Sequence, residues 1–91
     1  MALARHKDAT LIALFLDMLA AEQGAGANTL SAYRTDLDDL SAFLAAHKCD
    51  CAHASTDDLR AYLADLETRG FAASSVARRL SAMRHLFRFM L

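Results

Sequence analysis

Residues 73–90 read Ala-Ser-Ser-Val-Ala-Arg-Arg-Leu-Ser-Ala-Met-Arg-His-Leu-Phe-Arg-Phe-Met, and their periodicity decides the fold class. The apolar residues recur every three to four positions, which is the spacing of one helix face. The predicted core stripe consists of Val76, Leu80, Met83, Phe87 and Met90. The opposite stripe is polar and consists of Ser74, Arg78, Ser81 and His85, with Ala82 and Arg88 beside it. The stretch therefore predicts an amphipathic helix that begins near Ser74 or Ser75.

Three earlier segments show the same helical periodicity, over residues 8–23, 29–47 and 56–69. The chain of 91 residues has no proline and three glycines, so few residues interrupt a helix. Hydrophobic residues make up 55% of the chain and charged residues 23%, which is enough apolar material for one packed core. We predict a single all-α domain over residues 1–91, a bundle of four to five helices with its ordered core from about residue 8.

The ends of these helices carry capping residues. Two glycines close the first helix, and Asn28 is the expected N-cap of the second. Ser55 and Asp58 have the spacing of a capping box before the third helix. Gly70 stands where a C-terminal cap belongs, with Phe71 packing back on the last turn. The first helix has an apolar arc about 200° wide, which favours packing against two neighbouring helices or contact with another subunit.

The charges are distributed unevenly, although the net charge is only −1. Residues 36–67 hold eight acids and two bases, whereas residues 70–91 hold four arginines and no acid. The acids of the second and third helices are expected to be ordinary solvated charges. The outer face of the last helix combines cations and small hydroxyls, which suits the phosphates and the groove of duplex DNA. A solvated basic face is the other interpretation of the same pattern.

The connector between the second and third helices holds four residues of zinc-ligand type: His47, Cys49, Cys51 and His53. Their alternation does not match structural zinc sites, whose cysteine pairs lie two to four residues apart with a second pair further on. A disulfide between Cys49 and Cys51 would close a very tight ring. We therefore expect no metal site and two free thiols in a surface connector, whose replacement by serine leaves the stability nearly unchanged.

No catalytic motif is present: the sequence has no nucleophile elbow, P-loop, dinucleotide fingerprint or HExxH. It implies no cofactor. The most apolar stretch, residues 11–19, contains Asp17 and is shorter than the roughly 18 residues that span a bilayer. A signal-peptide pattern is also missing. We expect a cytoplasmic chain that is not an enzyme and has no membrane role.

Two stretches resemble signatures of the tyrosine recombinases, also called phage integrases. Residues 28–37, Asn-Thr-Leu-Ser-Ala-Tyr-Arg-Thr-Asp-Leu, resemble the signature of their second helix, and residues 73–89 that of their fourth. Phe15-Leu16 and Thr56-x-Asp58-Leu59 also fit. The resemblance covers about residues 11–90 and is close to the Xer subgroup, with the fourth helix more similar to XerD than to XerC.

The resemblance implies an N-terminal SAM-like core-binding domain that clamps one face of a recombination half-site in double-stranded DNA, for DNA integration or chromosome dimer resolution. The catalytic domain, which attacks a DNA phosphate with a tyrosine, would follow Leu91 and is absent from this chain. Other recombinase protomers are expected partners on DNA, through the first helix, and the isolated domain is expected to be monomeric. The positions that match DNA-contacting helices of the family are Thr29, Ser31, Arg34, Thr35, Ser74, Ser75, Arg78, Arg79, Ala82 and His85.

Two residues refine this prediction. Arg79 lies on the flank of its helix and suits a phosphate better than a base edge, and Asp38 shares the outer face of Thr35, which argues against deep groove contact there. The alternative is a helical protein-interaction domain with a basic final helix and no DNA role. Salt dependence separates the two, because a phosphate-driven complex weakens steeply as salt rises. A complete small enzyme is a third reading, which the missing catalytic set argues against.

Overall fold

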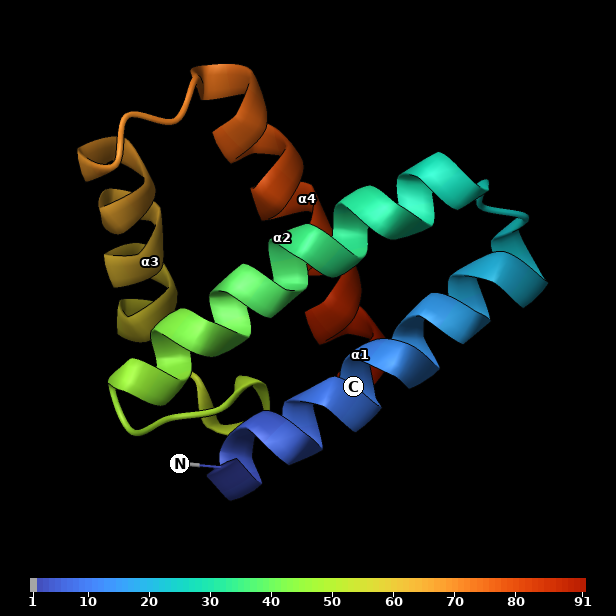
Figure 1. Ribbon diagram of the computed structural model, residues 1–91, viewed down its shortest axis with the longest axis horizontal. Helices are drawn as coiled ribbons and strands as arrows, with labels where there is room; N and C mark the ends of the chain where they lie inside the picture. Colours follow the sequence, from blue (N-terminus) through green and yellow to red (C-terminus); the bar gives the residue numbers. More distant parts are fainter. Residues whose placement is uncertain (1) are drawn as a thin grey trace.

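A computed structural model describes the backbone of residues 2–91, with side chains from residue 7 onward. Within that part the chain forms four α-helices, one turn of 3₁₀-helix and no strand, which confirms the all-α prediction. The elements are α1 (Ala2–Gln23), α2 (Ala27–Ala46), η1 (Cys51–His53), α3 (Thr56–Thr68) and α4 (Ala73–Met90). Figure 1 shows α1 and α2 running alongside each other, with α3 at one end of α2 and α4 crossing behind it.

The predicted boundaries are confirmed at α3 and wrong at the starts of two helices, since α1 begins at Ala2 rather than near residue 8 and α2 begins at Ala27. Ser55 and Asp58 form a reciprocal capping box. Gly70, at φ 84°, closes the helix, and the N–H of Phe71 donates to the Leu66 carbonyl at 3.1 Å, which is the bond of a Schellman motif. Asn28 is not the N-cap of α2. Gly26 is, with extended backbone and no side-chain bond, so Asn28 lies inside the first turn.

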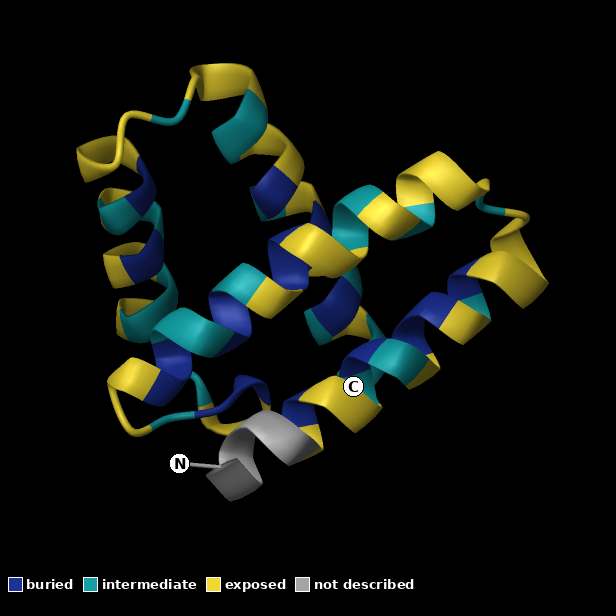
Figure 2. Ribbon diagram, in the orientation of Figure 1, coloured by how far each residue is buried: buried dark blue, intermediate teal, exposed yellow. Residues whose placement is uncertain are grey.

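The core forms where the four helices face one another, and the buried stripes point inward in Figure 2. Its buried members are mostly aliphatic, with one aromatic residue each from α1 and α3: Ile12, Phe15, Leu16, Leu19, Leu37, Leu40, Leu44, Tyr62, Leu66, Ala82, Met83 and Leu86. Cys51 also belongs to this cluster, at 1% exposure. The prediction of two thiols in a surface connector is therefore wrong for Cys51, because η1 turns its side chain into the core.

The α4 helix is rotated relative to the predicted stripe. Its buried residues are Arg79, Ala82, Met83 and Leu86. The predicted stripe residues Val76, Leu80, Phe87 and Met90 are half-buried. At about 100° per residue, the true core face lies about 70° round the helix from the predicted one. Ala82, expected on the outer face, is consequently fully buried.

The wide apolar arc of α1 is only partly covered. Ile12, Phe15, Leu16 and Leu19 face the core, whereas Leu14 keeps 55% of its surface exposed. Packing against two other helices, α2 and α4, accounts for most of the arc. None of the helices, in the part of the chain that the structure describes, is long and apolar enough to cross a membrane.

Candidate nucleic-acid interface

A shallow hollow lies at the seam between α2 and α4, with a volume of about 350 Å³. Asn28, Thr29, Ala32 and Tyr33 of α2 line one side, and Arg78 of α4 lines the other. These residues are far apart in the sequence, and they meet because α2 packs against α4. The hollow thus brings the first turns of α2 beside the first half of α4, which are the two stretches expected to contact DNA.

Most of the expected contact residues of α2 are at the surface. Thr29, Ser31, Arg34 and Thr35 are all exposed. The Thr35 hydroxyl donates to the Ser31 carbonyl at 3.1 Å, which holds that side chain against its own helix. Arg34 has no ion-pair partner among the described residues, so its guanidinium is available to an outside anion. Asp38 is exposed one turn further along, as the sequence indicated.

Arg78 stands at the edge of the hollow, but it is already paired. Its Nε and Nη2 atoms donate to the two carboxylate oxygens of Asp36, at 3.0 and 2.9 Å. The Asp36 side chain is 1% exposed and that of Arg78 is 49% exposed. These hydrogen bonds raise the pKa of Arg78, with the charge of Asp36 adding to the effect. Asp36 is thus a buried ion-pair partner rather than the solvated charge that we predicted.

Arg79 does not reach the surface, so its prediction as a phosphate contact is wrong. Its side chain is 7% exposed, and its Nη1 atom donates to Asp39 and to the Tyr62 hydroxyl, both at 2.9 Å. Its Nε atom lies 3.6 Å from an Asp36 oxygen, beyond hydrogen-bond geometry. The guanidinium carbon also stacks 4.6 Å from the centre of the Phe71 ring. A buried charge requires partners, and α2 and α3 supply them.

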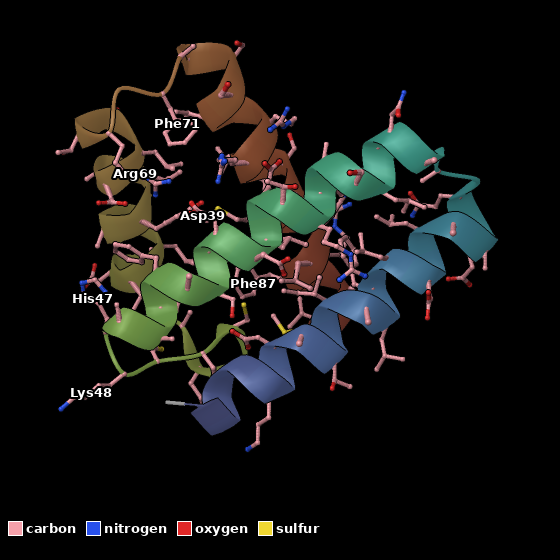
Figure 3. The ribbon with its side chains drawn as sticks, viewed as in Figure 1. Asp39, His47, Lys48, Arg69, Phe71 and Phe87 are labelled. Carbon is pink, nitrogen blue, oxygen red and sulfur yellow. The ribbon has the colours of Figure 1, made fainter. Side chains whose placement is uncertain are left out.

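Asp39 is the centre of this partly buried network. It accepts from Tyr62 at 2.7 Å and from both terminal nitrogens of Arg69, at 3.1 and 3.2 Å. Burial raises the pKa of the Asp39 carboxyl, but the hydrogen bonds from Arg69 and Tyr62 outweigh it and hold the pKa below its usual value. In Figure 3, Arg69 and Phe71 lie between α3 and α4 on the side facing Asp39. The network therefore joins α2, α3 and α4.

The remaining expected residues of α4 divide between surface and interior. Ser74 is exposed and Ser75 is half-buried, in the first turn of the helix. His85 is half-buried, 6.0 Å from the Tyr33 ring, and its Nδ1 atom is buried without a hydrogen-bond partner in the described structure. Ala82 is wholly inside. Of the predicted α4 positions, Ser74, Ser75, Arg78 and His85 thus keep exposed surface.

A second and larger hollow, of about 820 Å³, lies where the end of α4 meets the start of α1. Leu11, Phe87 and Met90 give it an apolar floor. Lys7, Arg84 and Arg88 give it cations. Arg84 and Arg88 are exposed, and neither was among the predicted DNA contacts. The absence of acids from residues 70–91 was the signal that pointed to them.

Comparison with known proteins decides the family. Residues 12–91 match the phage integrase, N-terminal SAM-like domain family. The chain belongs to this family. It is 66% identical over 88 residues to tyrosine recombinase XerD of Bradyrhizobium diazoefficiens, covering 97% of this chain and 28% of that protein. XerD of Rhizobium meliloti is 49% identical over 90% of this chain, and XerD of Yersinia pestis is 43% identical over 94%. No solved structure matches.

The resemblance to the XerD-like recombinases is thereby confirmed, and this SAM-like domain spans under a third of those relatives, from 26% to 29% of their length. The ten predicted contact positions stay predictions, with Arg79 and Ala82 removed because both are buried. Among the described residues, no group of three or more His, Cys, Asp or Glu side chains is placed to hold a metal ion. Both cysteines are free thiols.

Proposed function

We propose that this domain binds duplex DNA and clamps one face of a recombination half-site, as the N-terminal part of a XerD-like tyrosine recombinase. The observation that carries the proposal is the hollow between α2 and α4, where the exposed Thr29 meets Arg78, together with the unpaired and exposed Arg34 further along α2. An α-helix fits the major groove of B-DNA, and arginine supplies both phosphate contacts and readout of guanine. Membership of the SAM-like integrase family supports the same function.

The contacts divide by chemistry. Arg34 and the hydroxyls of Thr29 and Ser31 suit phosphate oxygens, because they are exposed on the first turns of α2. Ser74 and Ser75 lie in the first turn of α4, where free backbone N–H groups also favour an anion. These contacts set the register of the domain on the duplex, and Arg78 at the hollow is the candidate for reading a base edge.

The domain contributes binding rather than bond breaking. The chemistry of a recombinase, in which a tyrosine attacks a DNA phosphate, requires residues that this sequence lacks, and it belongs to another domain of the parent protein. Incubation with supercoiled DNA should therefore give neither nicks nor a covalent adduct. The parent protein would act on chromosomal DNA in the cytoplasm, in integration or in chromosome dimer resolution.

A second part of the proposal concerns neighbouring protomers. Leu14 of α1 is exposed and lines a shallow hollow with Lys7 and Leu11. An exposed leucine beside a partly covered apolar arc is suited to contact between protomers that sit on adjacent half-sites. A single small patch of this kind is too small for a stable free dimer, so the isolated domain is expected to be monomeric.

NMR titration with a DNA duplex tests the function. Shifts should cluster on residues 28–35 and on the first half of α4, and they should weaken steeply as salt rises. Arg34→Ala should weaken binding to every duplex and lower the salt slope by about one. Arg60→Ala is the matched control, because it removes the same charge from an exposed position of α3. Shifts confined to the connector around Lys48, or equal binding by wild type and Arg34→Ala, would contradict the proposal.

The alternative is a protein-interaction domain with a basic last helix. The larger hollow, with its apolar floor and three cations, is the observation that favours it. A titration in which the DNA duplex moves no peaks would support this function instead. The surface around Phe87 and Arg88 would then stay free for a protein ligand.

A further inference from the structure

Arg78 is held by a carboxylate that lies almost wholly inside the protein. We propose that Asp36 is a positioning residue for Arg78, and that it sets how selectively the domain discriminates between DNA sequences. The inference rests on the proposed DNA-binding function and adds to it a residue that does not itself contact DNA.

The geometry of the pair fixes one edge of the guanidinium. Nε and Nη2 of Arg78 donate to Oδ2 and Oδ1 of Asp36, so both oxygens are engaged by one side of the fork. Both N–H groups of Nη1 and the second N–H of Nη2 are left for another acceptor, on a side chain that is 49% exposed at the hollow. A two-point contact of this kind defines the orientation of the planar group as well as its distance.

The carboxylate is itself held in place. Asp36 is 1% exposed on α2, and Arg79 lies 3.6 Å from its Oδ1 atom. Arg79 is anchored in turn by Asp39 and by the Tyr62 hydroxyl. The support behind Arg78 therefore reaches across three helices. Because Arg79 remains beside it, Asp36 keeps a positive neighbour when Arg78 contacts DNA.

Two physical effects of Asp36 act on selectivity in the same direction. A free arginine side chain loses rotamer freedom when it is ordered on a ligand, and here the ordering exists before DNA arrives. The negative charge of Asp36 also offsets the attraction of Arg78 for any phosphate, which weakens binding to unrelated sequences. Asp36 thus favours contacts that depend on geometry over contacts that depend only on charge.

The experiment compares binding to two duplexes. One is enriched by the wild-type chain from a library with a randomised centre, and the other is a scramble of the same composition. Asp36→Asn should bind the scramble as tightly as wild type or more tightly. Its preference for the enriched duplex should fall about tenfold, which is near the lower end of the discrimination expected of one arginine–base contact. Asp36→Asn should cause no further loss of preference in an Arg78→Ala background.

Two further measurements separate positioning from a purely structural role. Arg78→Lys keeps the charge and leaves Asp36 a cation, but it lacks the fork, so it should show the same loss of preference with unchanged affinity for the scramble. In the free protein, the Arg78 Nε–H signal should be protected from exchange in wild type and lost in Asp36→Asn. Asp57→Asn is the control carboxylate, and it should keep this signal because Asp57 is exposed on α3 and takes no part in the support behind Arg78.

The outcomes distinguish this inference from the function on which it rests. A wild-type chain whose spectrum is unmoved by either duplex overturns both. A wild-type chain that binds DNA but enriches no sequence overturns the inference alone. The inference alone is also overturned if Asp36→Asn keeps the wild-type preference for the enriched duplex. The same holds if Asp36→Asn lowers this preference equally in the wild-type and Arg78→Ala backgrounds.

Discussion

Asp8 of α1 accepts a hydrogen bond from the hydroxyl of Ser41 of α2, at 2.7 Å, where Asp8 is only 2% exposed. Its other oxygen accepts from the backbone N–H of Cys51 at 3.0 Å. One carboxylate therefore joins α1 to α2 and holds η1 against both.

This arrangement makes Asp8 important for stability. Asp8→Ala leaves the Ser41 hydroxyl and the Cys51 N–H buried without their acceptor, which should lower the free energy of unfolding by about 1–3 kcal/mol. Urea unfolding followed by circular dichroism measures the effect. Asp17→Ala, at an exposed position of the same helix, should leave the midpoint unchanged. Equal midpoints for the two variants would show that the Asp8 bonds contribute nothing.

The two cysteines should differ in reactivity. Cys51 is 1% exposed, and burial raises the pKa of its thiol. Cys49 is half-buried, and burial raises the pKa of its thiol as well. Because the thiolate is the reactive form, Cys49 should react slowly with a disulfide reagent and Cys51 only after unfolding.

A thiol titration checks this order. The native chain should release one equivalent and the denatured chain two. Cys49→Ser should abolish the native reaction, and Cys51→Ser should preserve it. Two thiols that react at the same rate in the native chain would mean that η1 does not bury Cys51.

Acid should weaken the fold through carboxyls whose pKa is lowered in the folded state. Hydrogen bonds outweigh burial and lower the pKa of Asp39, through Arg69 and Tyr62, and that of Asp50, through His53. An unfolded aspartate has a pKa of about 3.9, so these groups stabilise the fold fully above that value and lose the contribution as pH falls through their lower folded pKa.

The measurement is the free energy of unfolding as a function of pH. It should decline below about pH 4, and Asp39→Asn should show a shallower decline than wild type because it removes one of these groups. Asp57→Asn alters an exposed aspartate and should keep the wild-type dependence. An Asp39→Asn curve parallel to wild type through the acid range would exclude Asp39 as a source of the dependence.

Local signals in the sequence were sufficient for the helices and most of their ends. The Ser55 capping box and Gly70 depend on residues within a few positions of one another, and both are confirmed. The start of α2 was missed because the backbone of Gly26 serves as the cap without a side chain, and the nearby Asn28 fits the N-cap preference by composition alone.

The face of α4 was predicted less well because it depends on distant partners. Helical periodicity predicts an arginine at this position on the outer face. Arg79 is buried nonetheless, because its guanidinium pairs with Asp39, which is 40 residues away in the sequence. Arg78 is paired with Asp36, 42 residues away. Neither carboxylate is recognisable as a partner until α2 and α4 are packed. The exposed hydroxyls of α2 were found from the sequence because their exposure follows from the core stripe of one helix.

The rotation of α4 itself is open to test, since it assigns opposite environments to two alanines of that helix. Ala82 is fully buried and Ala77 is exposed. Ala82→Leu adds three carbons to a packed interior and should lower the free energy of unfolding by about 1–3 kcal/mol. Ala77→Leu adds the same side chain at the surface of the same helix and should change the stability by less than about 0.5 kcal/mol.

Had α4 presented its core stripe as the hydrophobic periodicity indicates, Ala82 would lie on the outer face and both leucines would be tolerated. Equal unfolding midpoints for the two variants would therefore show that Ala82 lies at the surface, and Ala82 would again be a candidate DNA contact.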